Sequence, residues 1–369
     1  MFCPCDIRSL RPCAISANPT GTPAMTKSIV TTKWLSKNLD DPKLRIVDVT
    51  TYLRQAGATA GFFRTLPFTG KDEPAAGAVH ADIFRDLTDE ASKAPFVING
   101  TTMRLTIHPD AGTRGHYRFW SGQETHEESH IPGAVHADIL ALCDPEGRFP
   151  YTALSHDAFA KQAGALGIGD PDTFVVIYDQ GIGISFWASR LWWQLRMEGF
   201  ENVAVLEGGF AKWKAEGRPV ASGEVTPTKV EFTGSRREEL LATVEEVSRA
   251  IGDPSQIIVD SLSPADYRGE TASYGGRGHI PSSINIYCGD HTNPADNSFL
   301  GYDELRARLK PTGVLDPDQK VITYCGGGFG ATWNALVFHN LGKQDVAVFD
   351  GSMFEWSSDK SRPLETAVG

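Results

Sequence analysis

Residues 321–341 read VITYCGGGFGATWNALVFHNL, and this stretch decides how the rest of the chain is interpreted. Its first four residues are apolar, β-branched or aromatic and predict a buried strand. Cys325 then opens a glycine-rich loop, and the Ala-, Leu- and Val-rich residues 331–341 predict a helix directly behind it. The order strand, loop, helix is typical of an α/β fold, and it places a thiol beside a helix N-terminus.

The loop after Cys325 has the composition of an anion-binding site. Its residues are Gly326, Gly327, Gly328, Phe329 and Gly330. Closely spaced backbone N–H groups and the N-terminus of a helix both attract anions. The same field lowers the pKa of a thiol, and the thiolate is the form that attacks. A tight turn around a buried, inert cysteine has the same local sequence, so the wider chain has to discriminate between the two interpretations.

Length and composition limit the function classes. A chain of 369 residues is long enough for two domains of ordinary size. Its 41% hydrophobic and 22% charged residues are typical of a globular protein, and no apolar stretch approaches the ~20 residues of a membrane span. The net charge of -11 argues against nucleic acid as a partner. It also means that a local site has to attract any anionic substrate.

The cysteines do not form a disulfide framework, because there are only six in a chain of this length. No second pair accompanies Cys3 and Cys5 to complete a zinc site, so we expect neither a metal nor a cofactor. Free thiols favour a reducing compartment, and we expect a cytoplasmic protein. Residues 1–25 lack periodicity and predict a disordered tail. Alternatively they are a targeting segment of a mitochondrial protein, or an extension before a start at Met25.

The remainder of the chain reads as two similar halves. Strand-like runs occupy residues 45–49, 174–178 and 203–206, and again 257–260, 320–324 and 346–349. The motif His130-Ile131-Pro132 of the first half recurs as His279-Ile280-Pro281 in the second. Runs of this kind that alternate with helical patterns indicate an α/β fold, and the repetition indicates a tandem duplication of one domain.

The predicted division is a tail at 1–25, a first domain at 26–220, a linker at 221–236 and a second domain at 237–369. Inside the first domain, residues 77–83 recur word for word as residues 133–139, which suggests a segmental duplication. We therefore expect an insertion over about 53–128. Its simplest interpretation is an irregular surface loop without chemistry.

On these features the chain resembles the two-domain rhodanese-type sulfurtransferases, over nearly everything from Thr26 to Pro363. The most specific pieces are the paired His-Ile-Pro motifs, Trp192-Trp193 after Arg190, and the run from Cys325 to Trp356. The resemblance implies two rhodanese-like domains, each a parallel sheet flanked by helices.

The same resemblance implies that only the second domain is catalytic, because the first-half position matching Cys325 falls at Asp179 or Gln180. In such enzymes the cysteine cycles between thiolate and persulfide. The thiolate takes sulfur from a small anionic donor, thiosulfate or 3-mercaptopyruvate, and passes it to cyanide or a thiol such as thioredoxin or glutathione.

Arg190 and Arg196 are candidate cationic contacts for the donor. The resemblance places Arg190 at the interdomain position where family members bind the donor's anionic end, and arginine offers a bidentate fork there. Arg196 has an alternative interpretation as an exposed helix arginine. His130 and His279 are expected to fix the turns before Ile-Pro. Asp260 either acts electrostatically or serves as a cap.

The two residues after Cys325 bear on the donor. Thiosulfate-preferring relatives carry cations there, whereas mercaptopyruvate-preferring relatives have Gly and then Ser. Gly326 and Gly327 match the second class at one position and neither class at the next. A loop without cations loses more attraction for a dianion than for a monoanion. The sequence therefore favours 3-mercaptopyruvate.

Three alternatives remain for the function. A cysteine phosphatase has a loop one residue longer that ends in arginine, whereas Ala331 and Thr332 follow here. A persulfide carrier or rhodanese-fold binding module would keep the fold with little turnover. A structural protein would tolerate replacement of Cys325. Cysteine and arginine together favour the sulfurtransferase.

Overall fold

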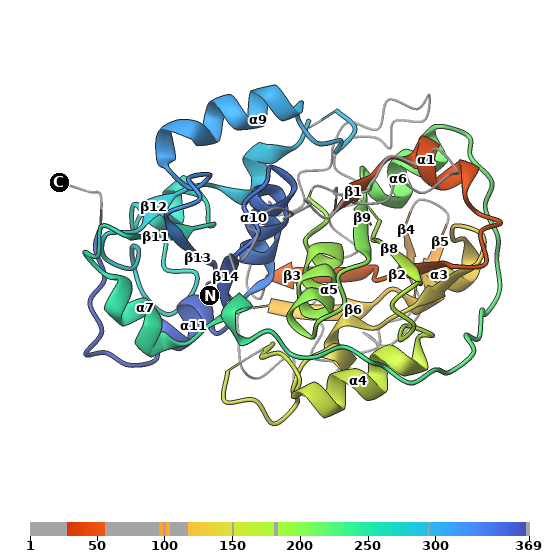
Figure 1. Cartoon of the computed structure of the whole chain (residues 1–369), viewed down its shortest axis with the longest axis horizontal. Coiled ribbons are helices and arrows are strands. Elements are labelled where there is room, and N and C mark those ends of the chain that lie inside the picture. Colours follow the sequence, from red (N-terminus) through yellow and green to blue (C-terminus); the bar gives the residue numbers. More distant parts are fainter. Residues whose placement is uncertain are drawn as a thin grey trace, which may run out of the picture.

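The computed structural model describes residues 28–55, 96–98, 101–103, 117–149, 151–180, 184–293 and 295–366. The predictions for residues 1–25, including Cys3, Cys5 and Cys13, and for the 77–83 copy of the repeat lie outside these ranges. The chain forms two lobes side by side, the first half in red to green and the second in cyan to blue (Figure 1). Within the described ranges, no helix has the length and apolar character needed to cross a membrane.

The first domain is built on a parallel sheet with the strand order β1-β9-β8-β2-β7. The strands are β1 (Ile29–Val30), β2 (Leu44–Asp48), β7 (Ala134–His136), β8 (Phe174–Tyr178) and β9 (Val203–Leu206). The helices are α1 (Thr32–Lys37), α3 (Gln123–Glu128), α4 (His156–Ala165), α5 (Phe186–Met197), α6 (Gly209–Ala215) and the short 3₁₀ helix η2 (Ile139–Leu142).

The second domain repeats this topology with the parallel order β10-β14-β13-β11-β12. Its strands are β10 (Leu241–Ala242), β11 (Gln256–Asp260), β12 (Ile284–Asn285), β13 (Lys320–Tyr324) and β14 (Val346–Phe349). Its helices are α7 (Val244–Ala250), α8 (Pro264–Tyr267), α9 (Tyr302–Leu309), α10 (Phe329–Asn340) and α11 (Ser352–Trp356), with the 3₁₀ helices η3 (Glu238–Leu240), η4 (Cys288–His291) and η5 (Lys310–Thr312). The predicted fold class is confirmed.

Alternation of side chains along the central strands creates two apolar faces on each sheet. In β8, Val175 and Ile177 pack toward α4 and α5, whereas Val176 and Tyr178 pack with α1 and α6. The second domain follows the same rule, because one face of its sheet packs with α9 and α10 and the other with α7 and α11. Both sheets are therefore covered on both faces by helices.

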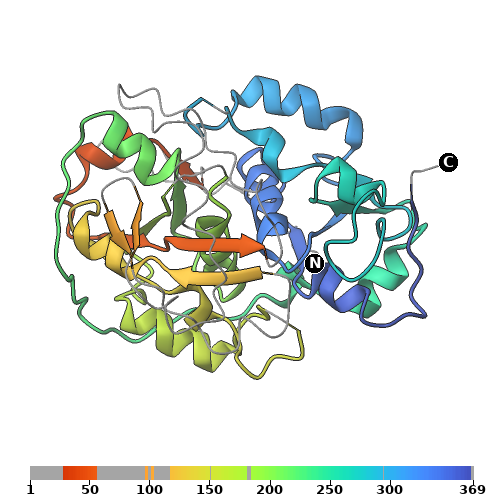
Figure 2. The ribbon, with the colours of Figure 1, turned by 180° about the vertical axis from the view of Figure 1, so that it is seen from behind.

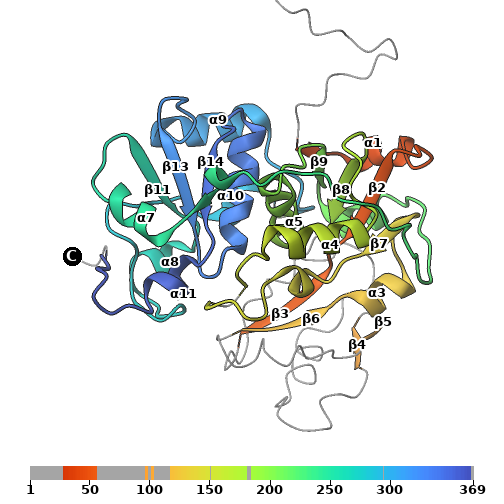
Figure 3. The same cartoon turned by 60° about the horizontal axis from the view of Figure 1, so that its bottom comes forward.

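The two domains share one core. Helices α5 and α10 lie against each other between the two sheets, as Figure 3 shows. The Ser189 and Thr332 hydroxyl oxygens of these helices are 2.9 Å apart, and both side chains are buried. The Trp193 indole donates to the carbonyl of Leu240 at 3.0 Å, which ties α5 to the start of the second domain. The loop after β13 consequently lies beside the domain interface.

The predicted insertion at about 53–128 is not irregular throughout. Strands β3 (Thr51–Gln55) and β6 (Tyr117–Ser121) pair antiparallel and lie next to each other in Figure 2. A second pair joins β4 (Phe96–Ile98) to β5 (Thr101–Met103). Helix α3 follows β6, and its buried His126 contacts Asp48 at the end of β2. The prediction of an irregular loop is wrong for these segments, because they pair with one another and α3 packs against the domain.

The predicted linker follows the first domain. Ala221 forms a bridge with His130, and the Val230 N–H donates to the carbonyl of Gly164 at 3.0 Å. Residues 222–237 contain neither helix nor strand. They run along the outside of the first lobe before η3 begins the second.

Candidate active site

Cys325 follows the last residue of β13 and is 4% exposed. Helix α10 begins four residues later at Phe329, and its N-cap Gly328 has φ 83°, in the left-handed region that favours glycine. The Cys325 thiol also lies close to Gly330, in the first turn of that helix. The predicted junction of thiol, glycine loop and helix N-terminus is therefore present in the fold.

The carbonyls of this loop are anchored and its N–H groups are not. The Cys325 carbonyl accepts from Met353 at 3.0 Å, and the Gly326 carbonyl accepts from Phe354 at 3.1 Å. Within the described part of the chain, the backbone N–H groups of residues 326–328 form no hydrogen bond. Backbone N–H groups need a partner, so this loop is suited to hold a negatively charged sulfur or substrate group.

Ser352 supports the backbone of Cys325. Its hydroxyl accepts from the Cys325 N–H at 3.1 Å and donates to the Phe349 carbonyl at 2.8 Å. The same oxygen lies 4.0 Å from the Cys325 Sγ. Ser352 has φ 49°, which is unusual for a residue with a side chain and is typical of functional sites.

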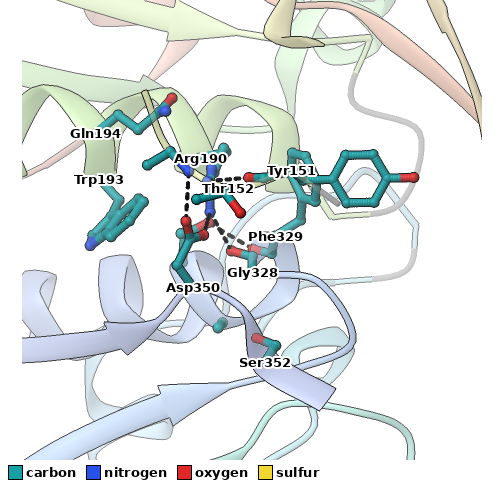
Figure 4. Close-up of polar contacts among 12 residues, drawn as sticks. Tyr151, Thr152, Arg190, Trp193, Gln194, Gly328, Phe329, Asp350 and Ser352 are labelled. Carbon is teal, nitrogen blue, oxygen red and sulfur yellow. Dashed lines mark hydrogen bonds and ion pairs between the residues drawn. The ribbon is translucent and has the colours of Figure 1, made fainter. Parts of the chain in front are cut away.

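Arg190 reaches the loop from the first domain, as Figure 4 shows. Its guanidinium forms an ion pair with Asp350 and donates to the Gly328 carbonyl at 3.3 Å and the Tyr151 carbonyl at 2.8 Å. The side chain is completely buried, and it lies over the rings of Trp193 and Phe329. Burial opposes its charge, but the Asp350 carboxylate more than compensates and raises the pKa of Arg190.

Arg190 and Asp350 together hold a strained segment of the first domain. Tyr151 has φ 67°, and its neighbour Ala153 donates its N–H to the second Asp350 oxygen at 2.7 Å. This conformation places the Tyr151 ring over the loop, at 3.1 Å from where a side chain on Gly327 would begin. A residue of the first domain therefore covers the Cys325 loop of the second.

Two further rings from the second domain complete this cover. A Cβ on Gly326 would collide with the ring of Tyr274, and a Cβ on Gly327 would lie 3.0 Å from the ring of Phe354. We call Tyr151, Tyr274 and Phe354 the aromatic cover. Position 326 therefore has no space for a side chain, because the Tyr274 ring fills it, whereas a side chain at position 327 would require the rings of Tyr151 and Phe354 to shift slightly.

Arg196 lies at the other end of α5. It lies six positions after Arg190, which corresponds to about 9 Å along a helix. It is 4% exposed, pairs with Glu201 at 2.9 Å and lies over the ring of Trp192. None of these contacts reaches the loop. The alternative interpretation of Arg196 as an exposed residue is wrong, because the ring and the carboxylate bury it.

The other sequence candidates have structural contacts. The Nδ1 atoms of His130 and His279 lie 2.6 Å and 2.7 Å from the carbonyls of His126 and Tyr267. Asp260 accepts from the Leu262 N–H at 2.8 Å, as a cap would, and from the Tyr324 hydroxyl at 2.7 Å. Burial raises the pKa of Asp260 to about 7. Within the described ranges, no group of three or more metal-binding side chains is arranged to hold a metal.

The equivalent position in the first domain is now defined. Residues Tyr178 and Tyr324 occupy the same register, opposite Asp48 and Asp260 in the adjacent strands. Asp179 therefore corresponds to Cys325, which settles the choice between Asp179 and Gln180. The first domain has no thiol at this position.

Fold and site define a tandem α/β protein in which one domain presents a cysteine in an amide-rich loop and the other covers it. The family model described as a rhodanese-like domain matches residues 113–216 and 243–359. These matches span more than half of the chain. The protein belongs to the rhodanese family and contains two rhodanese-like domains.

Its relatives are sulfurtransferases, which are transferases. The chain is 36% identical over 233 residues to thiosulfate sulfurtransferase from Bos taurus, covering 62% of this chain and 77% of the relative. It is 32% identical over 233 residues, with the same coverage, to 3-mercaptopyruvate sulfurtransferase from Homo sapiens. The crystal structure of SseA from Escherichia coli, a 3-mercaptopyruvate sulfotransferase with the rhodanese fold, superposes with a TM-score of 0.62 and 25% identity, over 88% of this chain and 98% of SseA.

Sequence reasoning missed most of the residues that surround Cys325. Asp350 and Ser352 lie inside the run from Cys325 to Trp356 but have no individual signal, and Tyr151 and Tyr274 lie in segments with no motif. Cys288 is one of six cysteines, and no local pattern distinguishes it. The one available signal was the pair of glycines after Cys325, which indicates that something bulky approaches the loop.

Proposed function

We propose that this chain is a sulfurtransferase that carries sulfane sulfur as a persulfide on Cys325. The observation that carries the proposal is the placement of the only thiol of the loop against unengaged backbone N–H groups at the start of α10. These groups would stabilise a thiolate and then a persulfide anion without a metal. Family membership supports the same chemistry.

The reaction divides into two displacements. The Cys325 thiolate attacks the transferable sulfur of the donor, and the bond from that sulfur to the rest of the donor breaks. Sulfite leaves from thiosulfate, or the enolate of pyruvate leaves from 3-mercaptopyruvate. An acceptor thiolate or cyanide then attacks the outer sulfur and restores the Cys325 thiolate, which gives ping-pong kinetics.

We propose 3-mercaptopyruvate as the preferred donor. The aromatic cover supports this choice, because rings occupy the space in which loop cations would otherwise stand. A donor with its charge on a carboxylate remote from the sulfur depends less on loop cations than a compact dianion does. Names of relatives include both donors, so they do not separate the two.

Arg190 is the proposed contact for the donor's anionic end. It is the cation that the structure brings to the loop, although Asp350 and two carbonyls already engage it. A role in donor binding for Arg196 rests on the sequence, since its contacts lie with Glu201 and Trp192. For the acceptor we propose a small thiol or cyanide, with thioredoxin and glutathione as the physiological candidates, in a cytoplasmic or mitochondrial setting.

The test is steady-state kinetics with thiosulfate and 3-mercaptopyruvate side by side, together with mass spectrometry of the protein after donor treatment. We expect one cyanide-labile sulfur on Cys325, and no activity in Cys325→Ser. The matched control is Cys143→Ser, which replaces another buried thiol. Full activity in Cys325→Ser would rule out the mechanism, whereas a persulfide without turnover would favour the carrier alternative.

A further inference from the structure

A second thiol lies beside Cys325. The sulfur atoms of Cys288 and Cys325 are 3.2 Å and 3.8 Å from the point where a Cβ on Gly330 would stand. Both cysteines are buried, and neither forms a disulfide. Two sulfurs from different segments, one after β12 and one after β13, therefore converge on a single point at the start of α10.

The identity of residue 330 agrees with this arrangement. Glycine is less favourable than alanine inside a helix. Gly330 is the second residue of α10 and does not have a positive φ, so its backbone does not require glycine. A Cβ at this position would crowd the Cys288 sulfur. The absence of a side chain at residue 330 avoids this contact and leaves both sulfurs next to the same unfilled point.

The surroundings of Cys288 distinguish it from Cys143. The Cys143 thiol donates to the carbonyl of Ile139 at 3.4 Å, and that contact gives it a structural role. The backbone N–H of Cys288 is held by the Ser261 carbonyl at 3.1 Å. Within the described part of the chain, the Cys288 thiol has no hydrogen-bond acceptor. Burial and the negative charge of Cys325 raise the pKa of Cys288, so it carries its proton.

We propose that Cys288 is a resolving thiol, which attacks the Cys325 persulfide and releases the transferred sulfur as sulfide. This inference rests on the proposed function, because it needs the persulfide. It adds an activity, the production of sulfide without an external acceptor. It also assigns a role to a residue that the transfer reaction itself does not use.

The step balances within the protein. The outer sulfur of the persulfide anion first takes the proton of the Cys288 thiol. The Cys288 thiolate then attacks the inner sulfur, the bond between the inner and outer sulfur breaks, the outer sulfur leaves as HS⁻, and a Cys288–Cys325 disulfide forms. The sulfane sulfur gains two electrons and the two cysteines lose two, so the donor's sulfur is the oxidant.

The disulfide has to be reduced before the next cycle. A dithiol reductant would attack one of the two sulfurs and restore both thiols. The class of reaction that follows this one is therefore thiol–disulfide exchange. A direct acceptor such as cyanide competes with Cys288 for the same persulfide, because each removes its outer sulfur.

The experiment treats three proteins with one equivalent of 3-mercaptopyruvate or thiosulfate per chain, and no other thiol and no cyanide is added. These are the wild type, Cys288→Ser and the control Cys143→Ser. Released sulfide is measured, and peptide mass spectrometry without reduction identifies the state of Cys325. The wild type and Cys143→Ser should release about one equivalent of sulfide per chain and contain the Cys288–Cys325 disulfide. Cys288→Ser should release almost none and retain one additional sulfur on Cys325.

The outcomes separate this inference from the proposed function. A wild-type protein that keeps its persulfide and releases no sulfide overturns the role of Cys288, while persulfide formation still stands. If no variant gains a sulfur or releases sulfide with either donor, the persulfide mechanism itself fails. The wild-type measurement needs no substitution, so it remains decisive even if Cys288→Ser does not fold.

Discussion

Arg190 of α5 and Asp350, the residue after β14, form a buried ion pair across the domain interface. Each partner also has a second contact, because Arg190 donates to the Gly328 carbonyl of the loop and Asp350 accepts from the Ala153 N–H of the first domain. The pair therefore links the Cys325 loop to the segment of the first domain that covers it. Through this arrangement the first domain contributes to the candidate site.

Removal of either partner should lower both stability and activity. A buried charge without its partner costs about 3–5 kcal/mol, whereas removal of both charges costs less. We expect Arg190→Ala to lower kcat/KM roughly ten- to a hundredfold, which is the loss of charge-assisted bonding converted to a rate. The measurement is a double-mutant cycle. It compares urea unfolding and donor kinetics of the wild type with those of Arg190→Ala, Asp350→Asn and the double variant. The double variant should be more stable than Arg190→Ala.

Arg196→Gln is the matched comparison, since it removes a buried guanidinium from the other end of the same helix. Its contacts predict a loss of stability with little change in the KM for the donor. A large rise in KM would instead give Arg196 the substrate contact that the sequence suggests.

The Arg190–Asp350 prediction has its own contrary outcome. Additive losses from Arg190→Ala and Asp350→Asn would show that the two residues act independently.

The Tyr151 ring should limit access to Cys325. The ring packs edge-on against Phe329 at 5.5 Å between centroids and lies over Gly327. Tyr151→Ala removes this ring, so we expect alkylation of Cys325 by iodoacetamide to become several-fold faster. Tyr151→Phe keeps the ring and should react at the wild-type rate. Equal rates in all three proteins would place the route to Cys325 elsewhere.

The aromatic cover should also decide whether the loop accepts a cation. Gly326→Arg alone is expected to destabilise the protein, because its Cβ collides with the Tyr274 ring. In a Tyr274→Ala background the same substitution has room, and it should raise kcat/KM for thiosulfate relative to 3-mercaptopyruvate. Tyr274→Ala alone is the control. An unchanged donor ratio in the double variant would show that charge at this position does not set specificity.

Much of the fold was predictable because its signals are local. The six central strands are runs of β-branched and apolar residues, and the structure places β8, β9, β13 and β14 at the predicted bounds. The edge strands β1, β10 and β12 have two residues each and carry no periodic signal. Their pairing depends on the neighbouring strand, so the sequence of the segment alone does not define them.

The candidate site divides in the same way. Cys325 and the glycine loop are adjacent in sequence, and their chemistry could be predicted from composition. Asp350, Tyr151 and Cys288 are brought to the loop by the packing of α5 against α10 and by the strand order. Such contacts join residues that are far apart in the chain. They follow from the tertiary structure and leave no motif in the sequence.

The two halves differ in a pair of equivalent carboxyl groups, and this difference predicts their effects on pH stability. Asp260 at the end of β11 has its pKa raised to about 7 by burial. Burial also acts on Asp48 at the end of β2, but the hydrogen bond from His126 and nearby histidine charges lower the pKa of Asp48. Both side chains are completely buried.

A raised pKa in the folded protein means that protonated Asp260 stabilises the fold below pH 4, and that this contribution is lost as the pH rises to about 7. Between pH 4 and pH 7, ionisation of Asp260 should lower the wild-type free energy of unfolding by roughly 2–4 kcal/mol. Asp260→Asn stays neutral and should remove that component. The measurement is urea unfolding at a series of pH values between 4 and 8.

Asp48→Asn is the internal control, and its effect has the opposite sign. The lowered pKa of Asp48 stabilises the fold above its unfolded value of about 4, and this contribution is lost as the pH falls. Asp48→Asn should therefore destabilise the protein most at neutral pH, where Asp260→Asn should relieve a buried charge. If both variants lose the same stability at every pH, the pKa values of Asp48 and Asp260 are not shifted in opposite directions, and the prediction is wrong.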